Sequence, residues 1–428
     1  METWGYPCGV IQQKPGSPLR ARTVELSEAP NLLDLFPVDG AAWIRRGQGM
    51  IGLGEVARLE GADFATAEAW WQDLYAGIAI ETELGDHPAS GPIALGSFTF
   101  DPTHTRLSSV LVIPQVIIGS RGGRSWLTTI TADDLPDAPA PTGQPAPVPP
   151  SGTRTVGGSL DRAGWSGIVA EAVSRIERDE ALEKVVLARS EVLASDNPID
   201  PRWLVTELAR DYPNCWTFHI DGLVGASPEM LLRREGGLAT SRVLAGTIRR
   251  HGTEELDLKL AQALARSGKN LIEHELAVES VARALEPFCS GMNVPDAPYV
   301  LELPNVMHLA SDVTAVAHPD VSALRLAGEL HPSAAVCGTP TAAARTVIAE
   351  LEHLDRGRYS GPVGWLDGRG DGEFAIALRC GCLDRNDPHR ITVYAGCGIV
   401  AESDPAEEYA ETEAKLLPMH HVLGQPTG

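Results

Sequence analysis

Short segments in which apolar and polar residues alternate are frequent in the first third of the chain. The clearest examples are residues 51–54, 92–100 and 109–118. Successive side chains of a β-strand point to opposite faces of its sheet, so such alternation is typical of strands with one buried face. The pattern predicts an antiparallel sheet in this part of the protein.

The middle of the chain combines helical and strand patterns. Residues 161–179 place apolar side chains at helical spacing, and the β-branched run 184–189 predicts a strand soon after that helix. Residues 254–285 form the longest helical pattern, with leucine and valine residues marking one buried side. We expect Gly268 to bend this helix, because glycine weakens a helix interior.

The C-terminal quarter alternates again. Residues 374–383 and 391–400 predict strands, and residues 405–417 predict a helix that begins at an Asp-Pro boundary. The sequence has no internal repeat and no regular succession of strand, helix and strand. Since that succession would indicate a parallel sheet, the pattern favours a mixed α+β architecture.

A proline-rich segment interrupts these patterns. Residues 133–151, with the sequence DDLPDAPAPTGQPAPVPPS, cannot enter the interior of a helix or sheet, because proline lacks the amide hydrogen that such structures need. We interpret residues 133–156 as an exposed excursion. It separates a more variable N-terminal part, residues 1–132, from residues 157–428.

Composition and charge restrict the classes of partner. With 428 residues and 43% hydrophobic side chains, the chain can bury a large core. Its formal net charge of -22 would repel a phosphate backbone, so we expect no nucleic-acid partner. The N-terminus lacks a basic start followed by an apolar stretch, and no run approaches the ~20 apolar residues of a membrane span. We therefore expect a cytoplasmic protein without a membrane partner.

Neither the cysteines nor the glycine-rich turns suggest a redox or nucleotide cofactor. The seven cysteines are scattered and lack paired C-x-x-C spacing, so we expect buried free thiols. The turns at residues 245–247 and 395–398 do not match the dinucleotide fingerprint G-x-G-x-x-G, and no P-loop is present. We expect no nicotinamide, flavin or ATP cofactor.

Polar residues on two helical segments are candidates for binding a divalent cation. Glu408 and Glu411 lie three residues apart and share a helix face, as do Asn270 and Glu273. A few oxygen ligands without a Cys or His box suit Mg²⁺, which keeps several waters and takes ligands from its substrate. Taken alone, each pair also fits an ordinary solvated helix face.

Two further residues have the chemistry of a base and an acid. Lys184 begins an apolar strand, where a partly desolvated amine can act as a base, although a lysine there can also keep a strand edge soluble. Glu229 precedes three apolar residues, where a half-buried carboxyl can stay protonated and donate its proton. An ordinary turn carboxylate is the alternative for Glu229.

Motifs from Lys184 onward resemble, in order, those of the chorismate-binding enzyme family. This family contains the isochorismate, salicylate, anthranilate and aminodeoxychorismate synthases. The motifs are KVVLAR (184–189), ASPEMLL (226–232), LAGTIRR (244–250), SGKNLIEHEL (267–276), MHL (307–309), LHPSAAVCGTP (330–340), RGRYSGPVGW (356–365), FAIALRC (374–380), YAGCGIV (394–400) and EEYAETEAK (407–415). Such a series is highly specific. The N-terminal part resembles the family more loosely, so the resemblance covers most of the chain.

The resemblance implies an α+β fold: a single large two-lobed domain, residues 1–428, of antiparallel sheets flanked by helices around a deep cleft. The proline-rich segment is then an insertion and not a domain boundary. It also implies that Glu273 and Glu411 hold Mg²⁺, with Glu408 and Asn270 beside them, and that the metal grips the ring carboxylate of chorismate. Asn270 departs from the family, which usually has an acid there.

The resemblance also implies which residues contact the rest of the substrate chorismate. Those for the enolpyruvyl carboxylate are Tyr359, Arg379, the Gly396 backbone and Lys415. Those for the ring are Gly246, Thr247 and His308. Arg379 suits its place because a guanidinium can pair both oxygens of a carboxylate. We expect these cations to reverse the acidity of the chain locally.

A few positions distinguish the sister reactions of the family. Ala245 stands where aminodeoxychorismate synthases place a lysine nucleophile, and Lys184 stands where anthranilate synthases typically have glutamine, which cannot take a proton from water. Ala335 resembles isochorismate synthases, whereas salicylate and anthranilate synthases usually carry threonine there. We therefore expect an isomerase that adds water at C2 and removes the C4 hydroxyl, with Lys184 as base and Glu229 as acid.

The sequence leaves three alternatives to this activity open. They are a salicylate synthase, an enzyme like anthranilate synthase component I, and a non-catalytic chorismate-binding relative. Isochorismate feeds both menaquinone and siderophore synthesis, and the sequence does not choose between them. We expect a monomer, because no coiled-coil heptad or conspicuous apolar surface stripe is present.

Overall fold

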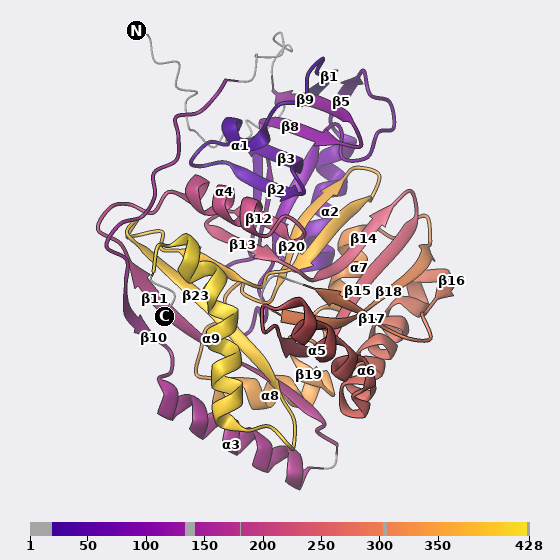
Figure 1. Ribbon diagram of the computed structural model, residues 1–428. Coiled ribbons are helices and arrows are strands. Elements are labelled where there is room, and N and C mark those ends of the chain that lie inside the picture. Colours follow the sequence, from indigo (N-terminus) through magenta and orange to yellow (C-terminus); the bar gives the residue numbers. More distant parts are fainter. Residues whose placement is uncertain (1–18, 133–141, 180, 303–305, 426–428) are drawn as a thin grey trace.

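Two large β-sheets, flanked by helices, form the centre of the protein (Figure 1). The computed structural model describes residues 19–132, 142–179, 181–302 and 306–425. The larger sheet contains, in spatial order, β10 (Arg154–Gly158), β11 (Lys184–Ala194), β23 (Arg390–Ile399), β22 (Cys380–Leu383), β13 (Leu223–Ser227), β12 (Trp216–Ile220), β2 (Ala41–Arg45), β3 (Gln48–Leu53), β8 (Val116–Arg121), β9 (Arg124–Thr131), β1 (Arg20–Glu25) and β5 (Ala79–Thr82), with β19 (Gly338–Thr339) beside β11.

The second sheet contains, in spatial order, β16 (Cys289–Asn293), β18 (Val306–Ala317), β15 (Leu238–Arg249), β14 (Met230–Glu235), β21 (Gly372–Ile376), β20 (Pro362–Asp367), β6 (Ile93–Ser97), β7 (Val110–Ile113) and β4 (Ala57–Glu60), with β17 (Tyr299–Glu302) beside β18. The helices are α1 (Leu32–Leu35), α2 (Phe64–Ala76), α3 (Arg162–Arg178), α4 (Pro201–Asp211), α5 (Glu254–Arg266), α6 (Gly268–Leu285), the 3₁₀ turn η1 (Glu286–Phe288), α7 (Ala323–Leu330), α8 (Thr341–Leu351) and α9 (Pro405–Val422). The pairings are antiparallel except for β1 with β5, which is parallel.

Strands from both sides of the proline-rich segment share each sheet. In the larger sheet β2 pairs with β12, placing Trp43 opposite Phe218, and in the second sheet β6 pairs with β20, placing Leu95 opposite Trp365. One hydrophobic cluster includes these four side chains and thus joins both sheets. Because neither half could form these sheets alone, the α+β fold is built as one intertwined unit.

The proline-rich segment agrees in part with its prediction as an excursion. Residues 133–141 lie outside the described residues, and residues 142–153 form no helix or strand. Residues 154–156, which the excursion was predicted to include, instead begin β10, which pairs with β11. The proline run ends at Pro150, so these later residues have the backbone N–H groups that a strand needs.

Predicted single strands were wrong in two places where the chain changes sheets. Residues 109–118 divide at Pro114 into β7 of the second sheet and β8 of the larger one. Residues 374–383 divide in the same way into β21 and β22, and the crossing includes Arg379 with φ 48°. Alternation reports which face of a strand is buried, but it does not report where a strand leaves one sheet for another. The predictions at 51–54, 92–100, 184–189 and 391–400 are confirmed by β3, β6, β11 and β23.

The predicted long helix over 254–285 is instead two helices. α5 ends before Ser267, whose extended backbone and side-chain acceptor cap the N-terminus of α6. The chain therefore breaks next to Gly268, where only a bend was expected. The helix predicted over 405–417 continues to Val422, because Leu416, Met419 and Val422 extend its buried face.

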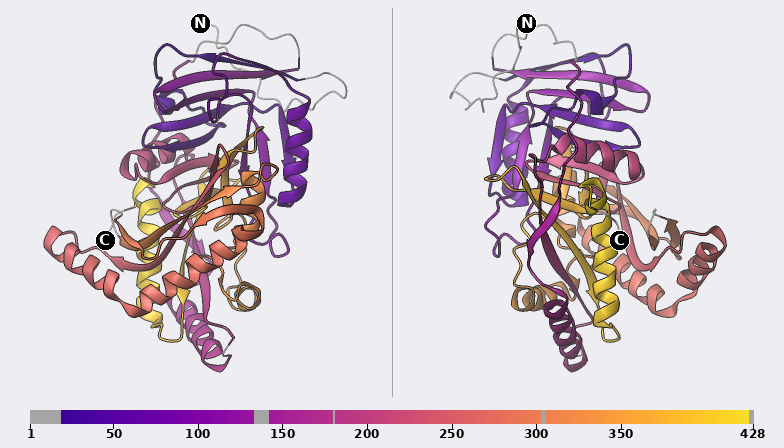
Figure 2. Two further views of the ribbon diagram at one scale, coloured as in Figure 1. Left: turned by 90° about the vertical axis from the view of Figure 1, so that its right-hand side faces the viewer. Right: turned by 60° about the vertical axis from the view of Figure 1, so that its left-hand side comes forward.

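Two helices that carry predicted site residues pack on different sheets. α9 packs along β23, and α6 packs on β15 and β18. The two views in Figure 2 show α9 beside the larger sheet and the α5–α6 pair at the end of the second sheet. The polar residues predicted on these two helices are therefore brought to a common region.

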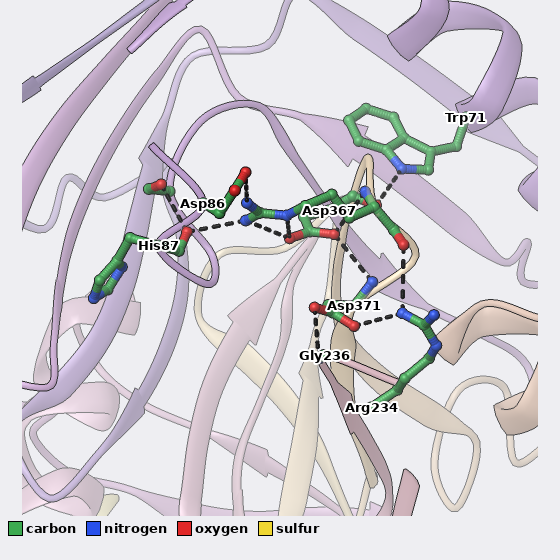
Figure 3. A network of polar contacts seen from close by, with 9 residues as sticks. Trp71, Asp86, His87, Arg234, Gly236, Asp367 and Asp371 are labelled. Carbon is green, nitrogen blue, oxygen red and sulfur yellow. Dashed lines mark hydrogen bonds and ion pairs between the residues drawn. The ribbon is translucent and has the colours of Figure 1, made fainter. Parts of the chain in front are cut away.

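A buried polar network fixes the hairpin ends of the second sheet (Figure 3). The Asp367 side chain accepts hydrogen bonds from the backbone N–H groups of Arg369 and Asp371. Asp371 in turn accepts from Arg234 at 2.5 Å and from the Gly236 backbone at 2.9 Å. Because these contacts join the β20–β21 turn to the β14–β15 hairpin, they fix the strand that directly follows Glu229.

The described cysteines are free thiols, five of them buried and Cys382 partly so, as predicted, whereas Cys8 lies outside the described residues. Among the described residues, no helix is both long enough and apolar enough to cross a membrane.

Candidate active site

A cavity of about 210 Å³ is lined by strands of both sheets and by α6 and α9. Every residue that the sequence placed in the site lines this cavity: Lys184, Glu229, Gly246, Thr247, Asn270, Glu273, His308, Ala335, Tyr359, Arg379, Gly396, Glu408, Glu411 and Lys415. These positions are widely separated in the chain, so the fold brings them together. Their individual roles stay predictions.

Lys184 enters the cavity from the beginning of β11. Its Nζ donates to Oε1 of Glu273 at 2.5 Å, and its side chain is 14% exposed. Gly398 lies on the neighbouring strand β23, where a Cβ atom would lie only 2.6 Å from Cε of Lys184. A glycine is therefore needed here for the lysine to cross the adjacent strand and reach Glu273.

Glu229 lies between β13 and β14 and faces the same cavity. Its backbone is anchored by hydrogen bonds with Ser227 and Ile376, but its carboxyl group forms no hydrogen bond with any described residue. Burial raises the pKa of Glu229 to about 7, although the positive charges of Lys184, Lys415 and Arg379 oppose this shift. The carboxyl is thus suited to carry a proton near neutral pH, as a general acid requires.

This shift predicts a pH-dependent stability difference for Glu229→Gln in the metal-free protein. Since the pKa of Glu229 is about 7 in the folded state against an ordinary 4.5, the folded state binds more protons between these values. Stability of the wild type should therefore fall as pH rises from about 4.5 to 7. The variant lacks this loss, so at pH 8 it should be more stable by up to about 3 kcal/mol, at about 1.4 kcal/mol per pKa unit.

Urea unfolding of both proteins between pH 5 and pH 8 measures this difference. The advantage of Glu229→Gln should shrink steadily as pH is lowered. A difference that stays constant over this range would contradict a raised pKa at Glu229.

Arg379 presents an uncompensated positive charge to the cavity. Its guanidinium forms no ion pair or hydrogen bond with any described residue, and burial lowers its pKa. The residue adopts φ 48°, a left-handed conformation that costs a non-glycine residue free energy and that clusters at functional sites. A buried, unpaired guanidinium is a suitable partner for a carboxylate of a ligand.

Two tyrosines and a lysine line the same cavity. The ring of Tyr359 stacks on Tyr394 with centroids 5.0 Å apart, and burial raises the pKa of Tyr359, which keeps it a neutral hydrogen-bond donor. Lys415 donates to the Gly396 carbonyl at 2.9 Å and pairs with Glu411 at 2.6 Å. These side chains therefore offer donors suited to an anionic group.

His308 and its neighbours form another part of the cavity wall. Its Nδ1 lies 2.9 Å from Oγ1 of Thr247, and its buried Nε2 has no hydrogen-bond partner among the described residues. Burial lowers the pKa of His308 to about 3, with help from Arg379 and Lys415, so the ring is neutral. Gly246 has φ 76°, which favours glycine, and brings this strand close to the side chain of Asn270.

The acidic residues of α6 and α9 fit a magnesium ion that needs few protein ligands. Burial opposes ionisation of Glu411, but Lys415, followed by Arg379 and His308, lowers its pKa overall. Burial raises the pKa of Glu408, whose Oε1 accepts from Ser403 at 2.7 Å. No group of three or more His, Cys, Asp or Glu side chains able to hold a metal occurs in the described part of the chain. Mg²⁺ is compatible with this donor set, because one or two carboxylates, water and substrate oxygens suffice for it.

The charge balance of the cavity differs from the prediction. We expected cations to dominate, but the lining contains four carboxylates beside Lys184, Arg356, Arg379 and Lys415. Both lysines are paired with glutamates, and Arg356 is paired with the buried Glu352. The unpaired positive charge is therefore confined to Arg379 among the described cations of the lining.

Several lining residues were not singled out from the sequence. Arg356 donates to the carbonyls of Val186 and Val336, and so joins the Lys184 strand to the loop that holds Ala335. Arg356 and Tyr394 lie inside the motifs RGRYSGPVGW and YAGCGIV, so these motifs could have indicated both as site residues. Ser403 lies outside every motif, and only its contact with Glu408 reveals it.

Comparisons with known proteins agree with this geometry. A family model described as "Chorismate binding enzyme" matches residues 43–424. An isochorismate synthase of Bacillus subtilis is 32% identical, over 80% of this chain and 77% of the relative. The salicylate biosynthesis isochorismate synthase of Pseudomonas aeruginosa is 36% identical, over 84% of this chain and 79% of the relative.

Solved structures show the same fold. The menaquinone-specific isochorismate synthase of Escherichia coli matches with a TM-score of 0.80 and 25% identity, over 95% of each chain. Anthranilate synthase component I of Streptococcus pneumoniae matches with a TM-score of 0.66 at 20% identity, over 96% of this chain and 94% of that one, which is a likeness of fold alone. The motifs, the family model and the shared α+β fold agree, and the chain belongs to the chorismate-binding enzyme family.

Proposed function

We propose that this protein is an isochorismate synthase that converts chorismate to isochorismate. Relatives named as isochorismate synthases match it at 32% and 36% identity over most of both chains. The observation that carries the proposal is that two side chains line one cavity. Glu229 is a buried carboxyl with a pKa of about 7, and Lys184 is an amine at the beginning of a strand. Such a pair supplies the acid and the base of a reaction that exchanges one hydroxyl for another.

Each residue has a defined task in this reaction. Lys184 takes a proton from the water that forms the new C2–O bond, and the ring double bonds shift. Glu229 gives its proton to the C4 oxygen, which leaves as water because a protonated hydroxyl is a better leaving group. Arg379 and Tyr359 bind the enolpyruvyl carboxylate, and neutral His308 contacts the ring.

Features of the cavity favour water over nitrogen chemistry. Ala245 lines the cavity where aminodeoxychorismate synthases have their lysine, so no nucleophilic amine is present at this position. Lys184 stands where anthranilate synthases have a glutamine. Ala335 leaves the space that a threonine would occupy in salicylate synthases, which supports retention of the enolpyruvyl group.

We also propose that Glu273 and Glu411 hold Mg²⁺, with Glu408 and Asn270 beside them. When bound, the metal would supply positive charge for the ring carboxylate of chorismate. Glu273 pairs with Lys184, and Glu411 pairs with Lys415. These ion pairs support the proposal, because each lysine neutralises a carboxylate whose charge a bound cation would also neutralise.

Product analysis tests the proposed function. Purified protein is incubated with chorismate and Mg²⁺, in the presence and absence of ammonium, and the products are separated by chromatography. We expect isochorismate in both cases, in an equilibrium mixture with chorismate, and no turnover after chelation with EDTA. Salicylate with pyruvate, or anthranilate formed only with ammonium, would contradict the proposal in favour of a sister enzyme. Binding of chorismate without any product would indicate a non-catalytic relative.

A further inference from the structure

A second cavity adjoins the active-site cavity, and we call it the rear cavity. It has a volume of about 200 Å³ and shares Glu229 and Ala335 with the active-site cavity. Its other walls come mainly from α6, β15, the end of α7 and the loop that follows α7, with single residues from β14, β21 and α8. The lining includes Ser280 and Glu329, which are exposed, so the cavity reaches the surface beside the contact between α6 and α7.

The rear cavity has the size and chemistry to hold water. Its α6 wall is built partly from small residues, including Ala277, Ser280 and Ala284. Its lining also includes Ser333, whose buried Oγ has no hydrogen-bond partner among the described residues. Buried hydroxyls in native proteins are normally satisfied, often by water. Its volume of about 200 Å³ accommodates several water molecules, since each occupies about 30 Å³ in the liquid.

The proposed reaction requires the release of a water molecule and the return of a proton to Glu229, and the active-site cavity alone does not provide a route for both. In each turnover one water is consumed at C2 and one is released from C4, while Lys184 gains a proton and Glu229 loses one. Before the next turnover the released water must leave, Lys184 must release its extra proton to solvent, and Glu229 must regain a proton. The Glu229 carboxyl has no hydrogen-bond partner among the described residues, so a proton has to reach it through water.

We infer that the rear cavity is the water route of Glu229. It takes up the water released at C4, and its water relays a proton from bulk solvent to the carboxylate while isochorismate still fills the active-site cavity. Solvent enters and leaves between α6 and α7, on the side of Glu229 away from the substrate. This inference rests on the proposed function, because it needs a reaction in which Glu229 gives up a proton to a leaving hydroxyl.

Filling the rear cavity from α6 tests the inference without touching the active-site cavity. Ala284→Leu and, independently, Ala277→Leu place a larger apolar side chain on its wall. Ala282→Leu is the matched control, because Ala282 lies on the same helix and outside the lining. Ala284→Val provides a smaller filling if a leucine variant does not fold, which thermal unfolding would reveal.

We expect the filled variants to lose kcat by about tenfold, equivalent to about 1.4 kcal/mol in activation free energy. Their KM for chorismate should stay within twofold of wild type, and the solvent deuterium isotope effect on kcat should rise because proton return becomes rate-limiting. Folded variants with unchanged kcat would overturn the inference, and so would a loss of kcat without a larger isotope effect. A wild-type protein that forms no isochorismate would instead contradict the proposed function.

Discussion

Lys184→Gln is expected to lower kcat for conversion of chorismate by about a hundredfold or more, the usual cost of losing a positioned base. Glutamine keeps much of the length of lysine and imitates the residue that anthranilate synthases have at this position, but it cannot take a proton from water. Chorismate affinity should be largely kept, because Arg379 rather than Lys184 carries the unpaired charge of the cavity. Steady-state kinetics with product quantification measure both quantities.

The same variant should fail equally in the reverse direction. The enzyme cannot alter the equilibrium between chorismate and isochorismate, so the residue that acts as base in one direction acts as acid in the other. Lys259→Gln is a matched control, since Lys259 is a solvent-exposed partner of Glu255 on α5 and lies outside the cavity lining. Retained water-dependent isomerisation in Lys184→Gln would remove Lys184 from the mechanism.

Glu411→Gln and Glu273→Gln should each abolish most of the activity by weakening the binding of Mg²⁺. An amide keeps the size of the side chain but removes the charge that a hard divalent cation requires. Calorimetric titration of Mg²⁺ into each variant provides a readout independent of turnover, and we expect the affinity to fall together with the activity. Folding should survive, because both carboxylates are at the cavity wall and their loss leaves the main core intact.

Glu407→Gln separates this effect from a general loss of negative charge. Glu407 is exposed, lies on the same helix α9 as Glu411 and does not line the cavity. Its variant should bind Mg²⁺ and turn over chorismate like the wild type. Near-normal turnover of Glu411→Gln or Glu273→Gln at limiting Mg²⁺ would show that the metal is held elsewhere.

The local pattern of apolar and polar residues predicted where several elements of the site begin and which side of each carries the site residues. On α9 the spacing of Glu408, Glu411 and Lys415 places all three on one side of a helix whose Asp-Pro start was evident in the sequence. Lys184 was expected at the beginning of an apolar strand and is the first residue of β11. Such features depend on residues near one another in the chain, so periodicity and capping chemistry are sufficient to predict them.

That pattern could not predict which strands lie beside one another in a sheet. The pattern predicts a single strand for residues 109–118, yet they contribute to two different sheets, and residues 374–383 do the same on either side of Arg379. A period of two fixes which face of a strand is buried, whereas the choice of partner strand depends on the packing of the whole core. The resemblance to a family, rather than the pattern, indicated that these segments meet around one cleft.

The sequence by itself therefore determined the secondary structure of most site-bearing segments and, through its ordered motifs, the family and the set of residues around the cavity. Only the tertiary structure decided the electrostatic state of those residues. The raised pKa of Glu229, the unpaired guanidinium of Arg379 and the rear cavity all result from which groups pack around a position and which do not. Burial and pairing arise between segments distant in the chain, so composition and spacing cannot supply them.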